Sequence, residues 1–554
     1  MKLRLTFFLL LCFLPCFAHA DSVEDLARDF WAWRATEQPF TSDDIVRIER
    51  PVNWVPDWSP HALAGYRQQL DVFENRWKKL HIESAPIPNQ VDYRLMGSAI
   101  ARVRWELYLN RSWEINPTFY LDQTLGAYAH LLLDPSPFDA KRTRAIVATL
   151  QSIPGTIENG KNNLTHPVAP FARLAIDQLE TAGPSLIKSV QELKPHLEPS
   201  ASQGLDKAAQ DALTALQSYK DWLKADLPKM SPAVAIGRKS YKFFLENVAL
   251  LPYTAEQLLD IGRQEWGRTV SSQIYEEHRN QGTPQLLLFK NQNEEIAKQK
   301  QAELSIRHYL EDKNLLTVPA WVKHYELAPI PSYLSPVSDA TETDDFTSAS
   351  RLQQNSTRYI DPPSPNLGYF ALSIAEDPRA ITVHEGVPGH YLQLALSWAH
   401  PDPVRRHYYD SSANEGLGFY AEEMMLHSGL FDDSPRTREI IWNYMRLRAL
   451  RVEVDVKLAL GEFDIEQAAD YLHRTVPMDA ETAHHEASFF ASTPGQAISY
   501  QIGKIQIYDF LASAQRQQGA KFNLRAFHDF LWRNGNVPIV LQRWEYLSEK
   551  PSLN

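Results

Sequence analysis

The chain has 554 residues, of which 56 are basic and 68 acidic, and its formal net charge at pH 7 is −12. This balance argues against nucleic acid and anionic membranes as partners, because both require a basic surface. With 44% hydrophobic and 11% aromatic residues but only 22 glycines, the composition favours a large helix-rich protein over an all-β one.

The first twenty residues have the pattern of a secretory signal peptide. Basic residues are followed by an apolar run from Leu5 to Phe17 and by the small-x-small site Ala18-His19-Ala20. We expect cleavage after Ala20 and a periplasmic or secreted protein without a membrane anchor, since no later segment reaches about 20 apolar residues. Both cysteines, Cys12 and Cys16, leave with this segment and neither follows a small residue. We therefore expect no disulfide and no lipid attachment.

Helical-looking stretches alternate with proline breaks from residue 21 to about residue 230. We expect this N-terminal helical region to pack as one continuous unit with a catalytic helical region, residues 231–554, because no linker or repeat separates them. Thr254 and Gln257 form a capping-box pattern, which predicts a helix start. Helices are expected to continue to about residue 313.

Residues 317–375 are rich in proline and carry two β-prone segments, Arg358–Ile360 and Gly368–Ile374. They predict a small antiparallel β-sheet near the active site. An exposed strand there could pair with an extended peptide, or the sheet could be purely structural.

Residues 384 to 390 read His-Glu-Gly-Val-Pro-Gly-His, a stretched form of the HExxH arrangement that holds zinc and activates water. On an ideal helix, six residues rotate by about 600°, so the two imidazoles would face directions roughly 120° apart. Pro388 has no N–H for the carbonyl of His384, and Gly389 tolerates an altered backbone. We therefore predict a kinked helix that brings His384 and His390 to one ion, with Glu385 facing the water.

Helices are expected on both sides of this motif and after it. The motif helix should begin at Asp377-Pro378 and end before Pro401, and the next should end near Ser428 with Gly429 as its breaker. Further helices are expected from Ser434 to about Gly461 and from Asp464, Asp479 and Gln496.

A catalytic zinc usually takes three protein ligands, so two histidines need a companion. Glu415 is the best candidate, because it starts a helix some 25 residues beyond His390, a spacing that suits an antiparallel pair. Glu422 lies about 700° further round, on nearly the same face, and could be the ligand itself or could orient one. Either carboxylate could instead be solvated on a helix surface.

Three ordered blocks of the chain resemble the bacterial domain of unknown function 885 family. The match is strong from about residue 380 to 545 and diffuse upstream, and a fourth, weaker block surrounds Phe527-His528-Asp529. The three blocks are His384–Gln393, Glu415–Glu422 and Pro494–Gly503.

This resemblance implies a helical zinc-peptidase fold similar to thimet-type oligopeptidases and Taq-type carboxypeptidases. It implies His384, His390 and Glu415 as ligands of one Zn²⁺ per chain and Glu385 as the general base. Manganese or cobalt could also occupy such a set. Relatives often carry Trp at the position of Leu417 and His where Ala459 aligns, and the second difference leaves the substrate class open.

An oxyanion also needs hydrogen-bond donors beside the metal. Tyr500 is the first choice and His485 or His528 the second, although Tyr500 could equally be a core tyrosine. Arg448 and Arg451 lie three apart on one helix and could grip a terminal carboxylate, or could be ordinary salt-bridge partners.

The sequence therefore predicts an exported, mainly α-helical zinc metallopeptidase that hydrolyses short peptides in a deep cleft. One alternative is a catalytically inactive peptide- or metal-binding protein on the same fold, although the intact Glu385 argues against it. Another is a zinc hydrolase of non-peptide amides or esters. The oligomeric state is not readable from the sequence.

Overall fold

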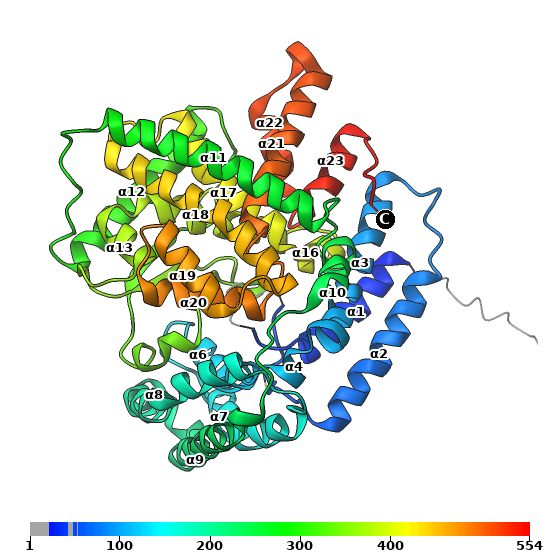
Figure 1. The fold of residues 1–554 in the computed structure, drawn as a ribbon, viewed down its shortest axis with the longest axis vertical. Coiled ribbons are helices and arrows are strands. Elements are labelled where there is room, and N and C mark those ends of the chain that lie inside the picture. Colours follow the sequence, from blue (N-terminus) through cyan, green and yellow to red (C-terminus); the bar gives the residue numbers. More distant parts are fainter. Residues whose placement is uncertain (1–21, 42–47, 53, 554) are drawn as a thin grey trace, which may run out of the picture.

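The computed structural model describes residues 22–41, 48–52 and 54–553. The predicted signal peptide, residues 1–20, lies outside the described residues. The described chain is mainly helical with one small sheet, as the composition indicated (Figure 1). Among its helices, none is both long enough and apolar enough to cross a bilayer.

In the described residues before the sheet, the named elements are helices, several of them short 3-10 or π turns. Thr254 caps α11, and the two reciprocal bonds of the predicted capping box are both present. The helices are α1 (Val23–Glu37), α2 (Pro60–Lys78), α3 (Ile87–Arg104), η1 (Trp105–Asn110), α4 (Ser112–Ile115), α5 (Thr118–Leu121), η2 (Asp122–Gly126), α6 (Ala127–His130), α7 (Ala140–Asn163), α8 (Ala169–Leu193), η3 (Lys194–His196), η4 (Pro199–Ala201), α9 (Leu205–Asp226), η5 (Leu227–Lys229), α10 (Gly237–Phe243), η6 (Phe244–Val248), α11 (Ala255–Arg279) and α12 (Gln292–Asp312).

The sheet has three strands in the order β1-β3-β2 and is mixed rather than antiparallel. β1 (Tyr325–Pro329) pairs in parallel with β3 (Ser356–Ile360), and β2 (Asp344–Asp345) pairs antiparallel with β3. The predicted strand at Arg358–Ile360 is confirmed within β3. The 3-10 turns η7 (Ser335–Ala340) and η8 (Ala349–Arg351) lie between the strands.

The predicted strand at Gly368–Ile374 is wrong, because this segment opens helix α13 (Tyr369–Glu376). A short apolar run does not distinguish strand from helix by its periodicity. A backbone N–H at the start of this helix finds its acceptor in a distant part of the chain, since the N–H of Tyr369 donates to Oδ2 of Asp479 at 3.1 Å.

The helices predicted at about 411–428 and 434–461 and from Asp464 and Asp479 are confirmed, and the one predicted from Gln496 begins at Ser499. The sequence analysis predicted no helix at α16, α22 or α23. Gly429 and Gly461 take the left-handed conformation that ends α17 and α18, and Asp464 and Asp479 cap α19 and α20. The helices are α14 (Arg379–Ile381), η9 (Thr382–Gly386), α15 (His390–Trp398), α16 (Pro403–His407), α17 (Ser411–Ser428), α18 (Pro435–Leu460), α19 (Ile465–Thr475), α20 (Ala480–Ser492), α21 (Ser499–Gln518), η10 (Gly519–Lys521), α22 (Leu524–Arg533) and α23 (Ile539–Leu547).

Long helices surround the segment that carries the motif. α17 packs against α21, and α11 packs against α18 (Figure 1). Both α17 and α12 contact η9, and α12 also contacts β1. Described residues before residue 230 share a hydrophobic core with later ones, since Val404, Tyr408 and Trp544 belong to the same buried cluster as Leu95 and Phe30. The motif is therefore held in the interior by helices from distant parts of the chain.

Candidate metal centre

His384 and His390 lie on either side of a break in one helix. The π-helical turn η9 carries His384, and α15 begins at His390. Between them Val387 is extended, with φ −123° and ψ 124°, and Pro388 has no N–H with which to continue the helix. The predicted kink is confirmed, as an interruption at residues 387–389 rather than a bulge within a continuous helix.

Gly389 is needed for close backbone approach. A Cβ atom at this position would lie 1.7 Å from the carbonyl oxygen of His384, far inside van der Waals contact. The indole N–H of Trp532 on α22 donates to the carbonyl of Pro388 at 2.6 Å. The break is thus fixed from both sides, and this rigidity sets the relative position of the two imidazoles.

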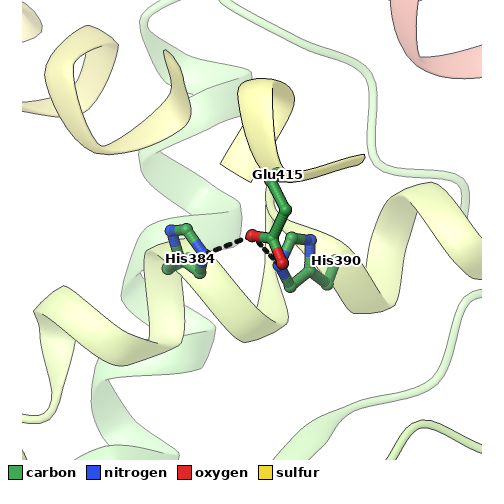
Figure 2. Close-up of side chains that lie close together, drawn as sticks. All are labelled: His384, His390 and Glu415. Carbon is green, nitrogen blue, oxygen red and sulfur yellow. Dashed lines mark hydrogen bonds and ion pairs between the residues drawn. The ribbon is translucent and has the colours of Figure 1, made fainter. Parts of the chain in front are cut away.

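The break brings both imidazoles to one carboxylate, Glu415 on α17 (Figure 2). Oε2 of Glu415 lies 3.2 Å from Nε2 of His390 and 3.4 Å from Nε2 of His384. One ligand atom from each residue lies within 4.8 Å of the other two, and all three residues are buried. The structure therefore brings together the three residues that the sequence predicted as ligands.

This spacing fits a tetrahedral metal ion. Zinc-to-ligand distances of about 2.0–2.2 Å place neighbouring ligand atoms of a tetrahedron roughly 3.4 Å apart. The two nitrogen-to-oxygen distances in the cluster are 3.4 and 3.2 Å. Two imidazoles and one carboxylate leave a fourth position for water or substrate, which is typical of catalytic rather than structural zinc sites.

Glycines on α17 allow the helices to come this close. A Cβ atom on Gly418 would lie 3.0 Å from Cε1 of His390 and 3.1 Å from Cε1 of His384. A Cβ atom on Gly416 would lie 2.5 Å from Cα of Gly503 on α21. The Glu-Gly-x-Gly sequence therefore carries the third predicted ligand and leaves the space that the two rings occupy.

Glu422, two turns further along α17, contacts the other edge of His384. Its Oε1 lies 2.6 Å from Nδ1 of His384 and 3.1 Å from Nη2 of Arg448. The sequence left open whether Glu422 replaces or supports Glu415. Because Glu415 lies on the Nε2 side of the ring and Glu422 on the Nδ1 side, Glu422 is placed to orient the imidazole rather than to join the ligand set.

Negative charge converges on the two imidazoles. Burial by itself would lower the pKa of His384, but the carboxylates of Glu415 and Glu422 outweigh burial and raise this pKa to about 9. Burial would raise the pKa of Glu415, yet His390 and His384 hold it far below its usual range. The cluster therefore favours positive charge at its centre, as a cation site requires.

Glu385 is the most exposed carboxylate of the site. Its side chain is 15% exposed, against 1–5% for the three predicted ligands. Oε2 of Glu385 lies 4.0 Å from Nε2 of His390, and Oε1 lies 3.9 Å from Nη1 of Arg358 on β3. Glu385 thus borders the cluster without belonging to the ligand set, as a general base must.

The sequence analysis assigned no role to Arg358 or to its partner Asp344. Arg358 forms an ion pair with Asp344 of β2, whose Oδ1 also accepts a hydrogen bond from the hydroxyl of Tyr325 at 2.8 Å. These residues meet Glu385 only because the register of the sheet pairs Asp344 with Arg358. No spacing along the chain could have indicated this contact.

Tyr500 lies beside the cluster. Its ring stacks on that of His384, with centroids 6.3 Å apart and planes inclined by 19°. The guanidinium of Arg451 lies 4.7 Å and that of Arg448 5.6 Å from the centre of the Tyr500 ring. Tyr500 is partly exposed, so the structure places this predicted donor at the edge of the site.

His528 lies elsewhere. Its Nδ1 donates to the carbonyl of Leu315 at 2.7 Å, and the hydroxyl of Tyr420 donates to its Nε2 at 2.8 Å. Burial lowers the pKa of His528 to about 4, so the ring is neutral and both nitrogens are in use. Within the described residues, His528 has no hydrogen bond or ion pair with the predicted ligands. The other second choice, His485, is exposed on α20.

Comparison with known proteins identifies one family and two solved structures that this chain resembles. The family model described as "Bacterial protein of unknown function (DUF885)" matches residues 51–543. Two solved structures of candidate lipoproteins are similar: one, of unknown function, from Shewanella oneidensis (TM-score 0.73, 17% identity, 95% of this chain and 100% of that one), and one from Colwellia psychrerythraea (TM-score 0.71, 17% identity, 95% and 97%). No curated protein matches the chain.

Sequence identity at this level shows a shared fold and carries no activity with it. The helical architecture around the cluster is therefore common to this chain and the two solved structures. The function of the cluster therefore depends on the chemistry of its own residues.

Proposed function

The chain belongs to the DUF885 family of bacterial proteins, and we propose that it is an exported zinc-dependent peptidase that hydrolyses short peptides. One observation carries this proposal: His384, His390 and Glu415 converge within 4.8 Å, and the partly exposed Glu385 borders them. A site with three protein ligands and an adjacent free carboxylate is the arrangement that metal-dependent hydrolysis requires.

His384 and His390 would hold the ion through Nε2, and Glu415 through Oε2. Zn²⁺ bound there supplies Lewis acidity and lowers the pKa of the attacking water to near 7. Glu422 keeps Nδ1 of His384 on its far side, so that Nε2 stays directed at the centre of the cluster.

Glu385 accepts the proton of the water as the water attacks the peptide carbonyl, and then delivers it to the leaving amine. Arg358, anchored by Asp344, holds the carboxylate of Glu385 from the side of the sheet. Tyr500, whose ring stacks on that of His384, is the donor that we assign to the oxygen that becomes negatively charged. His528 takes no part, because its nitrogens are committed to Leu315 and Tyr420.

Burial of the cluster favours short substrates. The side chains of the three ligands are 1–5% exposed, so a peptide has to enter in an extended, narrow form that the surface of a folded protein cannot present. Export is supported by the signal-like first twenty residues and by the description of both similar structures as candidate lipoproteins.

The test compares the wild type with Glu385→Gln in metal stoichiometry and in turnover of a peptide library. We expect about one zinc per chain in both proteins and turnover reduced at least roughly 10²-fold in the variant, the scale of a lost general base. Near-normal turnover by Glu385→Gln would overturn the assigned role. Zinc binding with no turnover of any peptide or amide by the wild type would instead favour a binding protein.

A further inference from the structure

Two arginines of α18 lie over the ring of Tyr500, and one of them makes a bidentate ion pair. Arg451 donates from Nε and Nη2 to the two oxygens of Glu486, at 2.7 and 2.6 Å. Arg448 contacts Glu422 through Nη2 at 3.1 Å. Its Nε and Nη1 are buried and have no hydrogen-bond acceptor among the described residues.

Buried N–H groups of a guanidinium are costly to leave without an acceptor, more so than those of a neutral donor. Three aromatic rings surround the guanidinium of Arg448. Its guanidinium lies 5.2 Å from the ring centre of Phe419, 4.9 Å from that of Tyr444 and 5.6 Å from that of Tyr500. A rigid, buried and partly unsatisfied fork of N–H groups suits a planar carboxylate.

A second unsatisfied donor lies close to Arg448. The hydroxyl oxygen of Tyr369 is buried without a hydrogen-bond partner in the described part of the chain. The rings of Tyr369 and Tyr444 lie 5.9 Å apart, and Tyr444 in turn adjoins Arg448. Tyr369 and Tyr500 are partly exposed, so this donor cluster reaches the edge of the interior.

The donor cluster adjoins the metal centre. Oε1 of Glu422 lies between the two residues, 3.1 Å from Nη2 of Arg448 and 2.6 Å from Nδ1 of His384. The ring of Tyr500 borders both Arg448 and His384. Consecutive Cα atoms of a peptide are about 3.8 Å apart. A carboxylate near Arg448 therefore lies within about one or two residues of a carbonyl at the metal centre.

We propose that Arg448, assisted by Tyr369, binds the C-terminal carboxylate of the substrate, so that the enzyme removes residues from the C-terminal end of peptides. This inference rests on the proposed function and specifies its substrate class. It also separates the roles of the two arginines, since Arg451 is a structural partner of Glu486 and Arg448 is the substrate ligand.

The experiment compares one short peptide in two forms, with a free C-terminal carboxylate and with a C-terminal amide. A third peptide, amidated but ending in Glu, distinguishes a side-chain carboxylate. Each is tested on the wild type, on Arg448→Lys and on the matched control Arg451→Lys. Arg448→Lys keeps a cation beside Glu422 but loses the fork of donors, and thermal melting checks that each variant is folded.

We expect the wild type to prefer the free acid in kcat/KM at least roughly 10-fold and to release C-terminal residues, as seen by mass spectrometry. Arg448→Lys should reduce the preference to near unity, whereas Arg451→Lys should keep it. Tyr369→Phe, which loses only a hydroxyl, should weaken the preference and serves if Arg448→Lys does not fold. Equal cleavage of acid and amide by the wild type, or an unchanged preference in Arg448→Lys, overturns the inference, as does equal use of the Glu-ending amide.

Binding gives a second readout that does not depend on turnover. In the Glu385→Gln background, with and without zinc, the Kd for the free acid should be lower than for the amide, and Arg448→Lys should remove the difference. If no peptide is cleaved by the wild type, the proposed function fails, yet this pair of Kd values still decides whether Arg448 binds the carboxylate.

Discussion

Nδ1 of His384 lies 2.6 Å from Oε1 of Glu422, on the edge of the ring opposite to the nitrogen that faces Glu415. One helix, α17, therefore carries both the third predicted ligand and a carboxylate that contacts the first. Seven residues separate Glu415 from Glu422, and on a helix this spacing returns to nearly the same face. On the proposed function, we expect the metal affinity to depend on Glu422, which lies outside the proposed ligand set.

Glu422→Gln is expected to weaken zinc binding by about 10- to 100-fold, the usual cost of losing such a partner. It should also lower the melting temperature, since Arg448 would be buried without its counter-charge. Competition with a chelator measures the affinity. Glu466→Gln, at a carboxylate that is 83% exposed, controls for loss of charge, and an unchanged zinc affinity in folded Glu422→Gln would contradict the orienting role.

Gly418→Ala is expected to impair zinc binding while the fold survives, because the new methyl group would crowd Cε1 of both imidazoles at about 3 Å. Gly416→Ala should instead destabilise the protein, since its methyl group would meet the backbone of Gly503 on α21. Gly65→Ala is the matched control: it lies in a helix with nothing within 4 Å, and it should be neutral or stabilising by up to about 1 kcal/mol. Tight zinc binding by Gly418→Ala would show that the rings can move aside.

We expect His528 to lower the free energy of unfolding as the pH falls and to have little effect on catalysis. Burial holds its pKa at about 4, below the usual 6.5. The unfolded chain therefore takes up a proton near pH 6.5 that the folded chain does not accept until about pH 4, so stability is lost as the pH falls through this interval. The loss approaches about 3 kcal/mol.

The measurement compares urea unfolding of the wild type and His528→Asn from pH 7 to pH 4. The difference between their unfolding free energies should shrink as the pH falls, because asparagine does not titrate. Turnover near pH 7 should change only a few-fold in the folded variant. Parallel stability curves, or a loss of turnover on the scale of Glu385→Gln, would restore His528 as a catalytic candidate.

Arg358→Lys is expected to lower kcat roughly 10-fold at nearly constant KM, because a charged contact that positions the base acts mainly on the chemical step. Zinc stoichiometry should not change, since Arg358 contacts Glu385 and Asp344 and none of the three ligands. Arg351→Lys, in the neighbouring pair with Asp345, is the control. A raised KM with normal kcat would assign Arg358 to substrate binding instead.

Local signals predicted much of the helical framework and, together with the family resemblance, the three residues that the structure brings together. The capping residues Thr254, Asp464 and Asp479 and the terminating glycines Gly429 and Gly461 act within a few residues of themselves, so the sequence reveals them. The kink at Pro388 was also predictable, because it follows from the missing N–H of one residue.

The errors and omissions arise where distant segments meet. The segment Gly368–Ile374 opens a helix, and a backbone N–H at its start donates to Asp479, more than a hundred residues later. The mixed sheet, the contact of Arg358 with Glu385 and the enclosure of His528 between Tyr420 and Leu315 depend on packing that no local pattern encodes. The same holds for Arg448 and Arg451, which pair with Glu422 and with Glu486 respectively.

Anomalous diffraction at the zinc edge, from crystals of the wild type grown with zinc, tests the proposed metal site directly. We predict one strong peak per chain, about 2.0–2.2 Å from Nε2 of His384, Nε2 of His390 and a carboxylate oxygen of Glu415, with Glu385 outside bonding distance. A map with no peak among these three side chains, or with the zinc bound elsewhere on the chain, would contradict this prediction.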